Sequence, residues 1–214
     1  TAPSTLPATT LANECYRAMF NGCTSLTVAP SISATTVAYY SCYSMFYNCT
    51  SLTTAPSTLP ATTLAESCYR SMFYNCENLT TVLIPSTVTT IGVSAFKNCN
   101  NLISVTMLNP TPPECEVDDE IWAFDEKATE SVILYVPKGS KVSYWLHPYW
   151  GKFKTIVEID VEGIEDVPTS DPNNINTNLP VYTLGGQKVA TNAKQLDMLS
   201  KGVYIIGNQK VLVK

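Results

Sequence analysis

Apolar and polar residues recur along the chain in blocks, and four of these blocks carry the same apolar signature. The signature is a Phe, a Cys and a Leu at fixed spacing: Phe20/Cys23/Leu26, Phe46/Cys49/Leu52, Phe73/Cys76/Leu79 and Phe96/Cys99/Leu102. Successive signatures are 26, 27 and 23 residues apart, and the string TAPSTLPATTLA of residues 1–12 returns at residues 54–65. Self-similarity at such a period indicates a solenoid, in which each coil buries its apolar face against the next.

Two local patterns in each block predict a short helix and a short strand. The helix pattern is an apolar stripe at i, i+3, i+4 and i+7, as in Tyr16, Met19, Phe20 and Cys23. The strand pattern is the Thr-rich or alternating segment after each Leu, such as LTTVLIP and LISVTML. Alternation predicts that Leu79, Val82 and Ile84 point inward, and likewise Leu102, Val105 and Met107.

The residue before each signature Cys is a Gly or an Asn: Gly22, Asn48, Asn75 and Asn98. These are the residue types that best tolerate a positive φ. We therefore expect a left-handed residue at the end of each short helix.

The unit CYRSMFYNCENLTTVLIPSTVTTIGVSAFKNCNNLISV resembles the BspA-type leucine-rich repeat of bacterial surface proteins. The earlier CYRxMFxxC units resemble the longer variant of gut Bacteroidetes. The segment from TPPECEV to KTIVEI resembles the closing section of these proteins. The resemblance implies an α/β fold, a right-handed leucine-rich-repeat solenoid of short strands and short helices, over residues 1–159. Repeats fill about residues 1–109, and a C-terminal cap fills about residues 110–159.

Bulky aromatic residues in the cap are expected to cover the open apolar face of the last coil: Trp145, Tyr149, Trp150 and Phe153. At the other end, residue 1 falls inside a repeat. We therefore expect that the natural chain begins earlier and that the first coil, lacking a neighbour, is a weak point.

The C-terminal part of the chain changes character. Residues 160–178 are acidic and polar, which predicts a linker. Residues 179–214 contain two candidate hairpins around Gly185-Gly186 and Gly207-Asn208, dipeptides that suit tight turns. This small all-β hairpin domain resembles the C-terminal sorting domain of secreted Bacteroidetes proteins. The resemblance implies export and attachment to the cell surface.

Composition narrows the possible partners. Charged residues make up 14% of the chain and the net charge is −5, without a basic patch. Nucleic-acid binding requires clustered Lys and Arg, so no nucleic-acid partner is expected. No run approaches the roughly 18 to 20 apolar residues of a membrane span, so no transmembrane segment is expected in this chain.

The chain has eight cysteines, and their spacing favours free thiols. On a helix, Cys15 and Cys23 would lie about 12 Å apart, too far for a disulfide. The four signature cysteines occupy equivalent places in successive coils, where a buried ladder of thiols is favoured, although a bridge between coils stays open. No CxxC pair exists and His147 is the one histidine, so neither a metal site nor a cofactor is expected.

No residue is assigned a catalytic role. His147 lies in an aromatic stretch without a visible orienting partner. The acidic run of residues 118–120 lacks the alternating spacing of a calcium loop. A glycan-active enzyme would need paired carboxylates, and none stands out in the repeats, so this third hypothesis is disfavoured.

The resemblance favours a secreted or cell-surface interaction protein of a bacterium, extracellular and adhesion-like. It would bind a protein or glycan of a host or cell surface through one face of the solenoid. The alternative is a structural spacer that projects another domain. The two differ in what precedes residue 1, since a large domain there would favour the spacer.

Strand alternation predicts which side chains line an outer face of the solenoid. The candidate ligand face is Thr27, Thr53, Thr80, Leu83, Ile103 and Thr106. It forms a neutral strip of threonines with some aliphatic groups, suited to hydroxyl hydrogen bonds and apolar contact. The strip is equally compatible with an unused sheet surface, because single exposed apolar residues are common.

Overall fold

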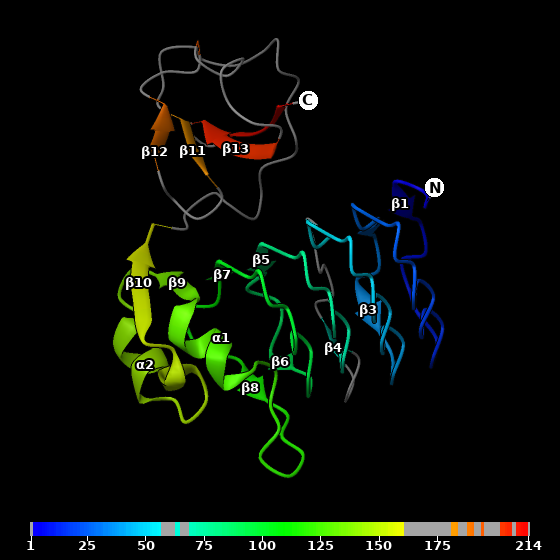
Figure 1. The fold of residues 1–214 in the computed structure, drawn as a ribbon, viewed down its shortest axis with the longest axis horizontal. Helices are drawn as coiled ribbons and strands as arrows, with labels where there is room; N and C mark the ends of the chain where they lie inside the picture. Colours follow the sequence, from blue (N-terminus) through cyan, green and yellow to red (C-terminus); the bar gives the residue numbers. More distant parts are fainter. Residues whose placement is uncertain are drawn as a thin grey trace. The chain divides into compact units, whose positions relative to one another are not determined.

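The computed structural model describes residues 2–56, 63–64, 69–160, 181–183, 188–190, 194, 202–206 and 209–213. The chain divides into two compact units, Thr1–Glu158 and Ile159–Lys214. The first unit is a β-solenoid whose coils stack in chain order, so that residues one repeat apart lie side by side (Figure 1).

Short parallel strands join neighbouring coils along the solenoid. β1 (Thr5–Leu6) pairs with β2 (Ser31–Ile32), β3 (Thr36–Val37) pairs with β4 (Thr63–Leu64), and β6 (Thr90–Ile91) pairs with β8 (Glu114–Cys115). The largest sheet of this unit has the order β10-β9-β7-β5, and comprises β5 (Thr81–Ile84), β7 (Ser104–Met107), β9 (Ile133–Pro137) and β10 (Thr155–Ile159). Each strand therefore gains its partner from the coil before or after it.

The predicted inward residues of these strands are confirmed. Leu79, Val82 and Ile84 are buried, and so are Leu102, Val105 and Met107. Val82 and Val105 are register partners in the parallel pair β5–β7, and Val105 continues the row to Leu134 of β9. Apolar residues of successive coils thus form continuous rows in the core, which removes their surface from water.

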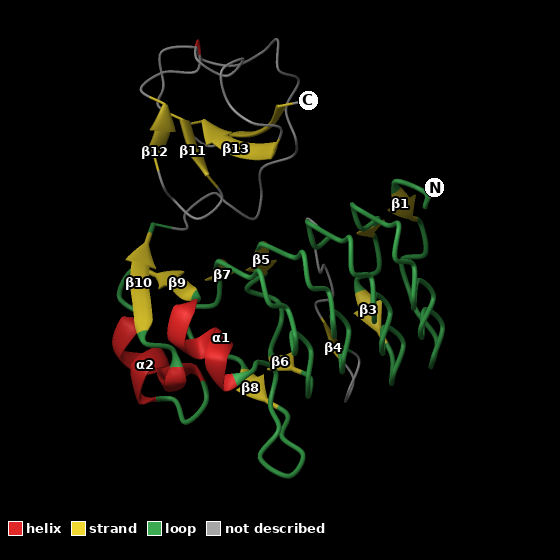
Figure 2. Ribbon diagram, viewed as in Figure 1, coloured by secondary structure: helices red, strands yellow, loops and turns green. Residues whose placement is uncertain are grey.

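The predicted short helices of the repeats are wrong. In the described part of residues 2–124 the structure contains strands, turns and loops but no helix (Figure 2). Backbone N–H groups alternate between two acceptors. Met45 N donates within its own turn to Cys42 O at 3.2 Å, whereas Phe46 N donates to Met72 O of the next coil at 2.9 Å. Half of the donors therefore bond between coils, which a helix cannot do because its bonds run from i to i−4.

The positive φ expected before each signature Cys is confirmed. The φ angles are 73° at Gly22, 59° at Asn48, 59° at Asn75 and 60° at Asn98. The structural reason differs from the expected one. Each residue is the third of a turn closed by the Cys N–H, as in Cys49 N to Phe46 O at 3.1 Å. A positive φ confined to the third residue is the geometry of a type II turn.

The C-terminal cap contains the described helices of the first unit: α1 (Glu126–Ser131), α2 (Lys141–Leu146) and the 3₁₀ turn η1 (Trp150–Lys152). As expected, Trp150 and Phe153 are buried and cover the last coil, and Tyr149 is half-buried. Trp145 is a correction, because it is 65% exposed. Its place inside α2 turns it outward beside Val142, while Tyr144 of the same helix is fully buried.

In the second unit, four strands form an antiparallel sheet in the order β12-β11-β13-β14. They are β11 (Val181–Thr183), β12 (Lys188–Ala190), β13 (Gly202–Ile206) and β14 (Gln209–Val213). The pairs β11–β12 and β13–β14 occupy the places of the two expected hairpins. Their turn dipeptides lie outside the described residues, as do residues 161–180, which include almost all of the expected linker.

Candidate functional site

Four residues of the predicted ligand face stack in one column across the coils. Thr53 N donates to Thr27 O at 3.0 Å, Thr80 N to Thr53 O at 3.4 Å, and Ile103 N to Thr80 O at 2.8 Å. Thr27, Thr53 and Ile103 are exposed, Ile103 by 60%, and Thr80 is half-buried. The structure therefore brings these four side chains together on one outer face.

Two threonine hydroxyls of this column are placed to donate to a backbone carbonyl within it. Thr53 Oγ1 donates to Thr27 O at 3.1 Å, and Thr80 Oγ1 donates to Thr53 O at 3.4 Å. A hydroxyl has one hydrogen to donate and two lone pairs. With the hydrogen used inside the column, each oxygen presents lone pairs to solvent. The column therefore suits a ligand that donates hydrogen bonds.

The remaining two predicted residues lie differently. Leu83 is half-buried, and Thr106 is only 3% exposed. Thr106 is the register partner of Leu83 on one side and of Tyr135 on the other. Both neighbours have larger side chains, so Thr106 is a buried residue and not an accessible part of the face. Strand alternation predicted the direction of the Thr106 side chain but not its burial between larger neighbours.

A second column lies beside the first and was not predicted from the sequence. Val28 bridges to Thr54, and Thr54 bridges to Thr81. All three side chains are exposed, Val28 by 62%. The sequence contains a signal for this column: each threonine of the first column is followed by a further uncharged residue. We name the two columns together the strand strip, which comprises Thr27, Val28, Thr53, Thr54, Thr80, Thr81 and Ile103.

The turn side of the coils is rich in tyrosine. The rings of Tyr47 and Tyr74 stack at 4.8 Å with an interplanar angle of 4°. The guanidinium carbon of Arg17 lies 5.2 Å from the ring centroid of Tyr43. Arg17 also pairs with Glu14 at 2.8 Å, an exposed ion pair that adds little stability. Several ring faces are therefore covered by neighbours within the solenoid.

Three of the four signature thiols form the predicted buried ladder, and the fourth is a correction, because Cys23 in the first coil is exposed. Cys49 Sγ donates to Phe20 O at 3.1 Å, Cys76 Sγ to Phe46 O at 3.2 Å, and Cys99 Sγ to Phe73 O at 3.2 Å. These three cysteines are free and buried, whereas Cys15 and Cys23 are free and exposed. Burial raises the pKa of Cys49 to about 11 and that of Cys99 to about 12. The ladder thiols therefore stay protonated at neutral pH and are poor nucleophiles.

His147 has a local structural role. Its Nδ1 accepts hydrogen bonds from the backbone N–H of Tyr149 at 3.3 Å and of Trp150 at 3.4 Å. Burial lowers the pKa of His147, which favours the neutral ring that these bonds require. Within the described residues, no group of three or more His, Cys, Asp or Glu side chains is placed to hold a metal ion.

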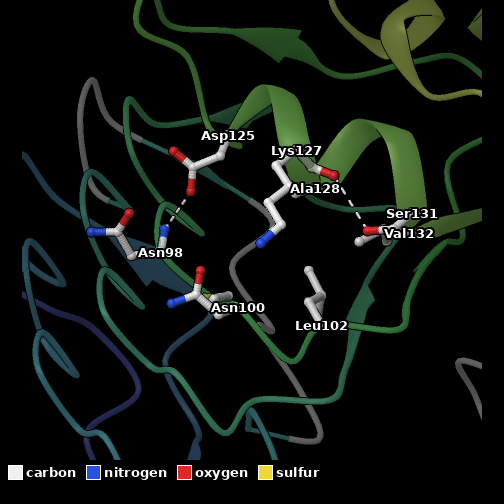
Figure 3. A pocket seen from close by; sticks show the side chains of 9 residues that line it. Asn98, Asn100, Leu102, Asp125, Lys127, Ala128, Ser131 and Val132 are labelled. Atoms are coloured by element: carbon white, nitrogen blue, oxygen red, sulfur yellow. Dashed lines mark hydrogen bonds between the residues drawn. The ribbon is translucent and has the colours of Figure 1, made fainter.

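A cavity of about 310 Å³ opens where the turns of the repeats give way to α1. Asn98, Cys99, Asn100 and Leu102 line it from the last regular turn, and Asp125, Lys127, Ala128, Ser131 and Val132 line it from the α1 side. Figure 3 shows Lys127 reaching from α1 into the space beside Asn100 and Leu102. This cavity could not be predicted from the sequence, because its position depends on how α1 departs from the repeat.

The repeats are the part of the chain that is similar to a known protein family. Residues 10–112 match the BspA type Leucine rich repeat region in six copies. This part of the chain is similar to BspA-type leucine-rich-repeat arrays. Leucine-rich repeats commonly mediate protein–protein interaction, their solenoids are typically not enzymes, and BspA-type proteins are often secreted or on the cell surface. The search of curated proteins found no match.

In the described part of the chain, no helix is a candidate for a membrane span. α1 and α2 have six residues each, and no described helix is both long and apolar enough to span a bilayer.

Proposed function

We propose that this protein is an extracellular interaction protein that binds a protein or glycan through the strand strip. The observation that carries the proposal is the in-register row of uncharged side chains on one face of the array. Two of its threonine hydroxyls, those of Thr53 and Thr80, donate to the backbone of the preceding coil. A partner therefore meets a preorganised surface and loses little entropy in ordering it.

The composition of the strand strip indicates how a partner binds. It has no charged side chain, so long-range electrostatic steering plays no part. Val28 and Ile103 supply exposed apolar surface at opposite ends of the strip, and the threonine oxygens between them accept hydrogen bonds. A hydroxyl-rich or amide-rich partner with small apolar groups fits this surface.

The proposal places the protein at the surface of a bacterium of the Bacteroidetes type. Support comes from the BspA-type repeats and from the sorting-type signature of residues 179–214. The described strands of that segment form an antiparallel four-stranded sheet, β12-β11-β13-β14. Export would be tested by fusing residues 179–214 to a reporter protein in such a host, with the fusion lacking them as control.

The binding experiment uses the whole chain on an array of glycans and host surface proteins. The test variant carries Thr53→Glu, Thr80→Glu and Ile103→Glu, which place three negative charges on the strand strip. The matched control carries Thr10→Glu, Thr36→Glu and Thr89→Glu, three exposed threonines outside the strip. Thr106 is left unchanged, because a buried carboxylate there would unfold the protein.

The proposal predicts that any ligand of the wild-type chain also binds the control variant and is lost by the test variant. Circular dichroism must show both variants folded. Equal binding by wild type and folded test variant would remove the strand strip as the site. A chain that binds nothing on the array while supporting an attached domain would favour the structural spacer.

A further inference from the structure

The cavity beside α1 lies at the end of a ladder of amide side chains. Asn75 Nδ2 donates to Asn48 Oδ1 at 2.8 Å, and Asn98 Nδ2 donates to Asn75 Oδ1 at 2.6 Å. Asn75 thus donates to the coil before it and accepts from the coil after it. Asn98 is the last of the series, and among the described residues no donor bonds to its Oδ1.

The next coil cannot supply that donor because its backbone leaves the repeat. Phe124 still stacks on Phe96 at 5.0 Å, and Phe96 N still donates to Ala123 O at 2.8 Å. Two residues after Phe96, Asn98 N donates to the side chain of Asp125, at 2.6 Å from Oδ2, and not to a backbone carbonyl of the next coil. α1 begins there, and the cavity occupies the place that another turn would fill (Figure 3).

The lining groups define what the cavity can hold. Asn98 Oδ1 is an acceptor, Lys127 is a cationic donor, and Asn100 carries both kinds of group. Leu102, Ala128 and Val132 form an apolar wall. A ligand that fits needs an N–H donor, an oxygen acceptor and a small apolar group close together. Those three groups are the parts of an acetamido group.

We propose that this cavity binds the acetamido group of an N-acetylated amino sugar. The ligand N–H continues the amide ladder at Asn98 Oδ1, its carbonyl oxygen accepts from Lys127, and its methyl group packs on Leu102 and Val132. A volume of about 310 Å³ is at the lower limit of small-molecule sites and suits one sugar ring. The proposal goes beyond the proposed function, because it adds a glycan class at a site separate from the strand strip.

Cys99 does not add a reactive group to the cavity. It lines the cavity but is 5% exposed, and its thiol donates to Phe73 O at 3.2 Å. Because burial raises its pKa to about 12, the thiol stays protonated at neutral pH. The thiol of Cys99 therefore supplies no nucleophile to the cavity at neutral pH.

The test is a titration of the whole ¹⁵N-labelled chain with N,N′,N″-triacetylchitotriose, followed by NMR. Cellotriose lacks the acetamido groups and is the matched control ligand. An acetyl-lysine peptide presents the same acetamido group from a different source. We expect the chitotriose to shift the side-chain amide signals of Asn98 and Asn100 at millimolar concentration, and the other two ligands to leave them in place.

Two variants locate the site. Lys127→Met keeps the aliphatic stem but removes the donor, and should weaken binding about tenfold, as loss of a hydrogen bond from a charged group does. Ser131→Phe fills the mouth of the cavity and should abolish binding. Lys138→Met removes an exposed charge elsewhere and should leave the affinity unchanged.

The proposal is overturned if the chitotriose shifts neither amide, if cellotriose shifts them equally, or if only the peptide does. Unaltered affinity in both Lys127→Met and Ser131→Phe would also overturn it. The outcome is separable from that of the proposed function. A strip-dependent partner on the array with a silent cavity refutes the sugar site alone, and a responsive cavity with no strip-dependent partner refutes the strip alone.

Discussion

Asn75 combines two roles in one side chain. It occupies a left-handed conformation with φ of 59°, and its amide joins those of Asn48 and Asn98 in a ladder. Asn tolerates this conformation better than other non-glycine residues, whereas a β-branched residue is strained there. The same position is Gly22 in the first coil, where the ladder is absent and only the conformational demand remains.

Replacement of Asn75 separates the two roles. Asn75→Val should lower the free energy of unfolding by about 1 to 3 kcal/mol more than Asn75→Gly does, because only Val adds backbone strain. Both variants lose the ladder bonds, so Gly is the matched control. Urea unfolding followed by circular dichroism measures both, and equal losses would show that φ is not the constraint.

The buried thiols predict a pH dependence of stability. Burial raises the pKa of Cys49, Cys76 and Cys99 in the folded state above the ordinary value near 8.5. Between the two values the unfolded chain has lost protons that the folded chain retains. Stability is therefore full below about pH 8.5 and falls as the pH rises toward the folded pKa values.

Unfolding by urea at pH 8 and pH 10 measures this decline. Each buried thiol contributes at most about 1.4 kcal/mol per pH unit. Cys76→Ala removes one titrating group and should show a shallower decline than wild type, whatever its stability at pH 8. An identical decline in the two proteins would mean that Cys76 does not titrate in this way.

The element that couples the coils is the turn segment with its column of phenylalanines. Phe20, Phe46, Phe73, Phe96 and Phe124 stack with ring centroids 5.0 to 5.5 Å apart. Beside the rings, alternate N–H groups of each turn donate to the next coil. The turns therefore stabilise the stack between coils, and not only within each coil.

Truncation of one ring tests this coupling. Phe73→Ala should cost about 3 to 5 kcal/mol, because Phe73 is 1% exposed and its loss opens a cavity between two coils. Phe20→Ala is the matched comparison, since Phe20 has a ring on one side only and is partly buried. It should cost clearly less in the same urea experiment. Similar costs would argue against a stacked column.

The contrast between the predicted helices and the observed turns has a physical origin. Met45, Phe46 and Cys49 point inward at a spacing of i, i+1 and i+4, which suits a helix face as well as successive turns. Apolar periodicity reports only which side chains are buried. Whether Phe46 N bonds to its own turn or to Met72 O depends on the neighbouring coil, which local sequence does not encode.

In the candidate site too, some features follow from the local sequence and others depend on neighbouring coils. The positions of Thr27, Thr53 and Thr80 followed from the repeat and from strand alternation, because both act locally. The burial of Thr106 depends on the size of Leu83 and Tyr135 in neighbouring strands. The cavity beside α1 arises where one element departs from the repeat, and a periodic pattern contains no information about such a departure.

At the scale of the whole solenoid, the two ends differ. The last coil is covered by Trp150 and Phe153 of the cap, both buried. The first coil has a neighbour on one side, and Met19 is 45% exposed although its counterparts Met45 and Met72 are buried. Local stability should therefore rise from the first coil toward the middle of the stack.

Hydrogen exchange can compare two equivalent amides. Phe20 N and Phe73 N each donate to a carbonyl of the next coil at 2.9 Å. Since the bonds match, a difference in exchange rate reports the stability of the coil. The Phe20 amide, like residues 2–26 as a group, should exchange faster than Phe73 and residues 70–105. Equal protection in a monomer would contradict the expected gradient.

The most direct test of the interaction proposal is to map the partner captured on the array by NMR. The account predicts that binding shifts the backbone amides of Thr53, Thr54, Thr80 and Ile103 and leaves those of Thr10, Thr36 and Thr89 in place. Shifts confined to the tyrosine-rich turns, or to α2 around the exposed Trp145, would contradict it and move the interaction surface to that face.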